Sequence, residues 1–143
     1  MPTVRKSALV HYSTAQMYAL VNDIESYPRF LPWCRSTRVL ERTTDEVKAT
    51  IEIAKGGIHK SFTTLNRLQA NKMIELRLLD GPFRRLDGFW RFEALDDNAS
   101  RVALDLDFEF ASGLLGLAFG PIFNQIANTM VDAFCKRAAQ LYG

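Results

Sequence analysis

The C-terminal part of the chain reads SRVALDLDFEFASGLLGLAFGPIFNQIANTMVDAFCKRAAQLYG, residues 100–143, and contains two different apolar spacings. From Val102 to Phe110, apolar and mainly charged residues alternate, which is typical of a strand with one dry face. From Pro121 onward, apolar residues recur every three or four positions, as on one face of a long helix. Proline suits the first turn of a helix, so we expect the helix to begin there. These spacings predict a sheet whose dry face packs against a C-terminal helix.

Alternation of apolar and polar residues extends upstream from this strand, which indicates that most of the chain forms a sheet. Glycine, asparagine and aspartate mark short turns between the alternating segments, so neighbouring strands should pair in antiparallel orientation. Together with one segment near the N-terminus, we expect seven strands, at residues 3–12, 35–43, 45–54, 58–68, 72–79, 83–95 and 100–111.

Two short helices are expected between the first and second strands. Ser13, with Gln16 three residues later, forms a capping-box pattern, so the first helix should begin at Ser13. The second helix lies in YPRFLPWC, residues 27–34, where Pro28 suits a helix start and Pro32 blocks its extension. The aromatic residues of this segment recur every three positions and so share one side of a tight turn. We expect that side to dock against the opening of the sheet, as a plug or as a gate.

These elements predict a single α+β domain over residues 1–143. A chain of this length suits one domain with a sizeable core. We expect a curved, seven-stranded antiparallel sheet wrapped round the long C-terminal helix, which is a helix-grip arrangement. A strongly curved sheet with a helix across its mouth leaves space between the two, and that space is the candidate binding site.

Composition and motifs argue against several classes of function. The 18 basic and 16 acidic residues give a net charge of +2, which is too balanced to argue for a nucleic acid partner by charge alone, and no DNA partner is expected. A local basic patch stays open. Cys34 and Cys135 lie far apart, and His11 and His59 are the only histidines, so a metal site is not expected. No GxSxG, phosphate-loop or HExxH motif occurs. We therefore expect a protein that is not an enzyme and requires no cofactor.

The expected location is the cytoplasm, because the N-terminal residues lack the apolar core of a signal peptide and no apolar run approaches about 20 residues. The segment GLLGLAFG, residues 113–120, places three glycines among apolar residues and should form a poor, flexible helix. It suits a lid or an edge that touches a membrane transiently, and equally the tightly packed start of a helix. A peripheral position at the inner face of the membrane is the alternative location.

Apolar and aromatic residues supply the candidate ligand-binding site. Ligand pockets are lined mainly by such residues, with few polar groups, but a solid core has the same composition, so both interpretations stay open. The candidates come from the second short helix, the inward face of the sheet and the long helix: Phe30, Leu31, Trp33, Trp90, Phe92, Leu106, Phe108, Phe119, Phe123 and Met130.

Three stretches carry a resemblance to a known family: YPRFLPWC at residues 27–34, DGPFRRLDGFWRF at 80–92, and LDFEF with NTMVDAFCKRAAQLYG at 106–110 and 128–143. With them, the chain resembles the coenzyme Q-binding START-domain proteins, a family also called polyketide cyclase/dehydrase-like. Within that family it resembles the bacterial ribosome-association toxin (RatA) group. The resemblance covers essentially the whole chain and implies a START/Bet v 1-like helix-grip fold with an elongated hydrophobic cavity.

The resemblance implies three functions. The first is non-catalytic binding of ubiquinone or another polyprenyl lipid in the cavity, in support of respiration. The alternative is a toxin that binds the large ribosomal subunit and blocks subunit joining, for which Arg84 and Arg85 are the candidate contact. A solvated sheet face explains these arginines equally well. The third is a cyclase or dehydrase, for which the sequence offers no evident acid or base.

Overall fold

The computed structural model describes residues 3–143 and contains seven strands in one antiparallel sheet, with helices between the first two strands and at the C-terminus. In the sheet the order is β1-β7-β6-β5-β4-β3-β2. Each strand from β2 to β7 therefore pairs with the next one in the sequence, and β1 pairs with β7 at the edge. The elements are β1 (Thr3–Val10), α1 (Thr14–Asn22), the 3₁₀ helix η1 (Ile24–Arg29), β2 (Cys34–Arg42), β3 (Glu46–Lys55), β4 (Ile58–Gln69), β5 (Met73–Asp80), β6 (Phe83–Asp96), β7 (Ala99–Phe110) and α2 (Gly113–Tyr142).

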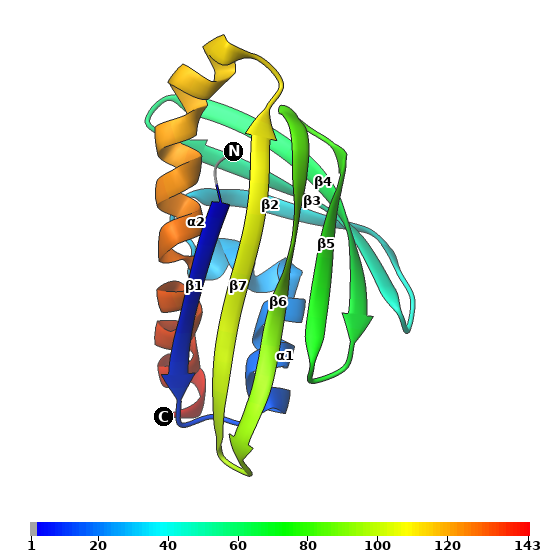
Figure 1. Cartoon of the computed structure of the whole chain (residues 1–143), viewed down its shortest axis with the longest axis vertical. Helices are drawn as coiled ribbons and strands as arrows, with labels where there is room; N and C mark the ends of the chain where they lie inside the picture. The colour runs from blue at the N-terminus through cyan, green and yellow to red at the C-terminus, as the bar shows by residue number, and fades with distance from the viewer. Residues whose placement is uncertain (1–2) are drawn as a thin grey trace.

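The predicted fold class is confirmed. Figure 1 shows the sheet bending so that β2, β3 and β4 run at a steep angle to β1, β6 and β7, with α1 and α2 on its concave side. The seven predicted strands are all present, with ends that differ by a few residues from those expected. In β7 the predicted alternation holds, since Val102, Leu104 and Phe108 are buried and Arg101 is exposed.

The backbones of β6 and β7 approach closely at Gly88. Gly88 pairs with Leu106 across the β6–β7 ladder, and a Cβ at residue 88 would overlap the carbonyl oxygen of Asp105 and lie 2.9 Å from the Cα of Leu106. Glycine inside a strand commonly marks such an approach of two backbones. The β6–β7 register is irregular next to Phe83 and Ala94, and irregularities of this kind increase the local twist of a strand.

Helix α2 fills the concave face with a row of aromatic residues. Phe119 and Phe134 are fully buried, and the ring of Phe134 lies edge-on to that of Trp90, with 5.2 Å between the centroids. The ring of Phe123 lies edge-on to that of Phe108 in the sheet, with 4.8 Å between the centroids. Such pairs add to the stabilisation that burial of the rings provides. The helix has the length and apolar character of a membrane-spanning segment, but this face of it belongs to the core.

The start of α2 differs from the prediction. The helix begins at Gly113 instead of Pro121, because Ser112 caps it by accepting a hydrogen bond from the backbone N–H of Leu115 at 3.1 Å. Pro121 therefore lies inside the helix, where its ring removes a backbone hydrogen bond and favours a kink. Figure 1 shows the first turns of α2 inclined to the remainder of the helix. The segment 113–120 is thus helical, with Phe119 buried and Leu117 exposed.

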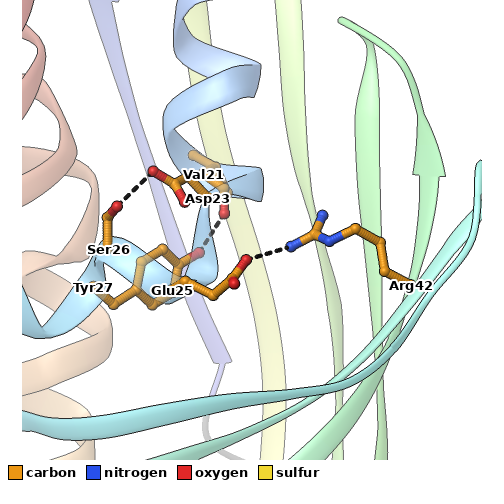
Figure 2. Close-up of polar contacts among 6 residues, drawn as sticks. All are labelled: Val21, Asp23, Glu25, Ser26, Tyr27 and Arg42. Carbon is orange, nitrogen blue, oxygen red and sulfur yellow. Dashed lines mark hydrogen bonds and ion pairs between the residues drawn. The ribbon is translucent and has the colours of Figure 1, made fainter.

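The second short helix also differs in position. The capping box of α1 is present as predicted, but η1 begins at Ile24, so Pro28 lies near its end and not at its start. Figure 2 shows why: the hydroxyl of Tyr27 donates to the carbonyl oxygen of Val21, which fixes η1 directly against the end of α1. On the exposed side, Ser26 donates to Asp23 at 2.6 Å.

We expect Gly88→Ala to lower the free energy of unfolding by about 3 kcal/mol, because a new methyl group would force apart the backbones of β6 and β7. Gly113→Ala is the matched control, since nothing lies within 4 Å of a Cβ there, and its free energy should change by less than about 1 kcal/mol. Urea denaturation of the two variants measures the difference. Equal stability of the variants would contradict the role given to Gly88.

Candidate functional site

A cavity lies inside the fold, between the concave face of the sheet, η1 and the middle of α2. Its volume is about 70 Å³. That is room for a few water molecules and lies well below the roughly 300–1,000 Å³ of sites for drug-sized ligands. The walls are Ile24, Tyr27, Trp33, Ala49, Ile51, Ile53, Phe62, Thr64, Asn66, Leu76, Leu86, Trp90, Leu104, Leu106, Phe123, Ile126, Ala127 and Met130.

Half of the ligand-binding candidates named from the sequence line this cavity: Trp33, Trp90, Leu106, Phe123 and Met130. They come from the segment after η1, from β6, from β7 and from α2, so four separate parts of the chain converge on one space. The cavity is smaller than the elongated one that the resemblance implies, because large rings occupy the concave face of the sheet.

The other five candidates lie elsewhere. Phe30 and Leu31 line a groove on the outside of the fold. Phe92 packs edge-on against Tyr18, with 5.7 Å between ring centroids. The two remaining candidates lie in an aromatic cluster at the N-terminal end of α2: Phe108 and Phe119.

Trp33 separates the cavity from the outer groove, since it is the one residue common to both linings and is 8% exposed. The groove runs between the segment 30–33 and α2, and its volume is about 500 Å³. On its far side the guanidinium of Arg137 lies over the ring of Phe30, 5.1 Å from the centroid. Such a contact holds Phe30 against the helix. The geometry therefore makes Trp33 the wall between an internal space and an external one.

Sequence reasoning missed the polar residues of the cavity. Thr64 and Asn66 follow one another on the inward face of β4 and are only 6% and 7% exposed. The hydroxyl of Thr64 donates to Oδ1 of Asn66 at 2.7 Å. Their neighbours across the ladders are apolar, including Ala49 and Leu76. A signal existed in the sequence, because two polar residues stand at inward positions between Phe62 and Leu68 of the predicted strand.

Within residues 3–143, the Asn66 side chain is hydrogen-bonded to Thr64 through Oδ1 of its amide. Its amide nitrogen is not one of the fully enclosed polar atoms without a partner, which are Oδ1 of Asn22 and the Nε atoms of Arg85 and Arg137. Because Asn66 lines the cavity, the N–H donors of its amide are open to a molecule that enters that space.

The titratable groups close to the cavity are held in their neutral forms. Burial, with smaller contributions from Cys34 and Asp23, raises the pKa of the Tyr27 hydroxyl far above its ordinary value. Burial and the nearby Glu52 raise the pKa of the Cys34 thiol to about 11, so it is a thiol and not a nucleophilic thiolate at neutral pH. Among residues 3–143, no group of three or more metal-ligating side chains gathers.

The two arginines named as a ribosome contact lie at the start of β6, and each faces a carboxylate. Arg84 pairs with Glu109 at 3.1 Å, and Arg85 lies 3.7 Å from Asp87. A second group of arginines lies along β1, β6 and β7, and we call it the arginine cluster: Arg5, Arg91 and Arg101. These three line one groove with Glu93 and Asp105, and within the described chain none of them forms an ion pair shorter than 4.0 Å.

Comparison with known proteins places this geometry in a family. The chain is 48% identical over 142 residues to the ribosome association toxin RatA of Escherichia coli K12, covering 99% of this chain and 90% of that one. It is 29% identical to the mitochondrial coenzyme Q-binding protein COQ10 of Dictyostelium discoideum, over 92% of this chain and 66% of that one.

Among solved structures, the Zhui aromatase/cyclase from Streptomyces sp. R1128 superposes with a TM-score of 0.81 at 19% identity, covering 97% of this chain and 94% of that one. That identity indicates a shared fold only. The family model for polyketide cyclase/dehydrase and lipid transport matches residues 10–135, which is most of the chain. By this match and by the full-length identity to its relatives, the chain belongs to the START-like polyketide cyclase/dehydrase and lipid-transport family.

Proposed function

We propose that this protein is a non-catalytic binding protein whose cavity takes an apolar ligand, with ubiquinone or another polyprenyl lipid as the candidate. One observation carries the proposal: an apolar cavity inside the core has at its wall the amide of Asn66, whose hydrogen bond to Thr64 uses the amide oxygen and leaves its N–H donors for a ligand. The relative named as a coenzyme Q-binding protein supports the choice of ligand. The driving force would be removal of ligand surface from water, at roughly 25 cal/mol per Å².

The size of the cavity defines how such a ligand would bind. A quinone ring needs more than the present volume of about 70 Å³, so the cavity must widen on binding. Movement of Trp33 would join the cavity to the outer groove of about 500 Å³. The ring of the ligand would then occupy the cavity, and the apolar tail would leave past Trp33 along Phe30 and Leu31. Trp33 would act as a gate in this scheme.

The proposal includes no catalytic step. Cyclases and dehydrases need an acid or base that changes its protonation state near neutral pH. The polar side chains at the cavity wall are Tyr27, Thr64, Asn66 and, through their indole N–H groups, Trp33 and Trp90. The raised pKa of Tyr27 keeps its proton in place. The hydroxyl of Thr64 and the amide of Asn66 are suited to bind and orient a ligand.

If the cavity binds a lipid in the cell, the protein purified without detergent should carry it. We expect organic extracts of the native protein to contain about one equivalent of a quinone or another polyprenyl lipid, identified by mass spectrometry. Protein denatured and refolded in the absence of lipid is the control and should yield none. Extracts of native protein that match this control would contradict the proposal.

Trp33→Ala tests the gate. Removal of the indole should open the cavity to the groove and speed dissociation of bound lipid about tenfold or more, measured by transfer to acceptor vesicles. Phe92→Ala is the control, because Phe92 is equally buried but lines neither space. Both variants should lose about 3–5 kcal/mol of stability. Equal dissociation rates in the two variants would show that Trp33 only fills the core.

Ribosome association is the second candidate function, and the observation that favours it is the name of the relative with 48% identity over the full chain. The binding surface would be on the outside of the sheet, and the large subunit is the candidate partner. Cations without a carboxylate partner release more counterions from RNA than cations already paired. The arginine cluster is therefore better suited to this contact than Arg84 and Arg85 are.

In sedimentation with ribosomal subunits, the protein should associate with the large subunit and lower the fraction of joined ribosomes, and both effects should weaken steeply with salt. Arg91→Glu combined with Arg101→Glu should reduce association about tenfold or more. Arg84→Glu combined with Arg85→Glu should reduce it less, because their charges are compensated. Salt-insensitive association would count against the contact with RNA.

A further inference from the structure

Two polar residues of β4 form a pair at the cavity wall. We call Thr64 and Asn66 the polar pair; both are more than nine-tenths buried, both line the cavity, and they contact each other through one hydrogen bond of 2.7 Å. They belong to β4, which lies between β3 and β5 in the middle of the sheet. Ala49 and Leu76, across the ladders on either side, are apolar and offer no side-chain hydrogen bond.

The polar pair has more donors than it can use. The amide of Asn66 carries two N–H donors and the hydroxyl of Thr64 carries one, whereas the hydrogen bond between the two side chains uses only one of the three. If the amide is turned over, its N–H donates to the hydroxyl oxygen and the hydroxyl hydrogen becomes free, so two donors are unused in either orientation. The cavity wall therefore presents hydrogen-bond donors in an otherwise apolar surface.

This excess defines the chemistry of a matching ligand. A ligand with carbonyl or ether oxygens can accept the unused hydrogen bonds, whereas a pure hydrocarbon leaves them without a partner. Burial of a donor without an acceptor disfavours the complex, so the pair discriminates between ligands of equal size and shape. The neighbouring Tyr27 cannot supply this function, because its hydroxyl already donates to Val21.

We propose that the polar pair is the recognition point of the cavity, and that it binds the oxygen acceptor of a ligand that is otherwise apolar. The proposal rests on the function proposed above and adds the chemical class: a molecule with a carbonyl or ether oxygen at the end that reaches β4. The tail of such a ligand points away from the sheet, towards Trp33 and the groove.

Two probes of matched shape test the proposal on the full chain. Duroquinone and durene have the same ring and the same four methyl groups, and they differ by the two carbonyl oxygens. Duroquinone has no free ring position, which protects Cys34 and Cys135 from addition. In calorimetric titrations we expect duroquinone to bind about tenfold more tightly than durene, the effect of one good hydrogen bond.

Substitution of the pair should remove this preference. Asn66→Leu keeps the approximate volume and removes both N–H donors, so duroquinone should bind about tenfold more weakly and durene should bind at least as well as before. Thr64→Val removes the hydrogen bond that orients the Asn66 amide, so it should reduce the preference severalfold. Thr63→Val is the matched control, because Thr63 is the adjacent residue on β4 and its hydroxyl contacts Thr50 at 2.7 Å on the opposite face.

The outcomes separate the two proposals. Equal affinity of the original protein for the two probes, or an unchanged preference in Asn66→Leu, would overturn the role of the polar pair and leave the apolar site intact. Binding of neither probe would overturn the proposed ligand site itself, and the polar pair with it. If Asn66→Leu does not fold, the preference for duroquinone over durene is compared between Thr64→Val and Thr63→Val. Identical preferences in these two variants would overturn the proposal.

Discussion

The close approach of β6 and β7 at Gly88 is the constraint on which the packing of the two strands behind the cavity depends. With no side chain at that position, the backbone of β6 can lie against Asp105 and Leu106. The same ladder places Trp90 opposite Leu104, and both line the cavity. The sheet is bent and α2 lies on its concave side, so the cavity takes its walls from the sheet and from the helix.

Much of this architecture could be predicted from the sequence, because alternation and helical periodicity report directly which side chains are buried. The errors have local causes. Pro121 is compatible with a helix start, but Ser112 caps the helix upstream of it. The helix therefore begins at Gly113 and contains the proline. Pro28 is likewise compatible with a helix start, but η1 begins at Ile24. The hydrogen bond from Tyr27 to Val21 joins η1 to the end of the preceding helix. Propensity describes what a residue tolerates, whereas a cap or a tertiary hydrogen bond determines which of the tolerated positions it takes.

The candidate site was less accessible to such reasoning. Core and ligand pocket have the same composition, so the sequence could not distinguish Trp90, which lines the cavity, from Phe92 two residues later on the same face. Their difference arises from Tyr18 of α1, which covers Phe92. The polar pair did leave a trace in the pattern of β4. An excess of apolar residues does not point to Thr64 and Asn66, because these two residues are exceptions to that excess.

The positions of the tryptophans have a practical consequence. The chain contains two tryptophans, Trp33 and Trp90, and both line the cavity, one next to the groove and one on the sheet. The intrinsic ultraviolet emission of the protein therefore comes from the walls of one small space, with no background from indoles elsewhere. Any change in the polarity or filling of that space will alter the emission of the whole molecule. The protein thus carries its own optical reporter of occupancy and needs no attached dye.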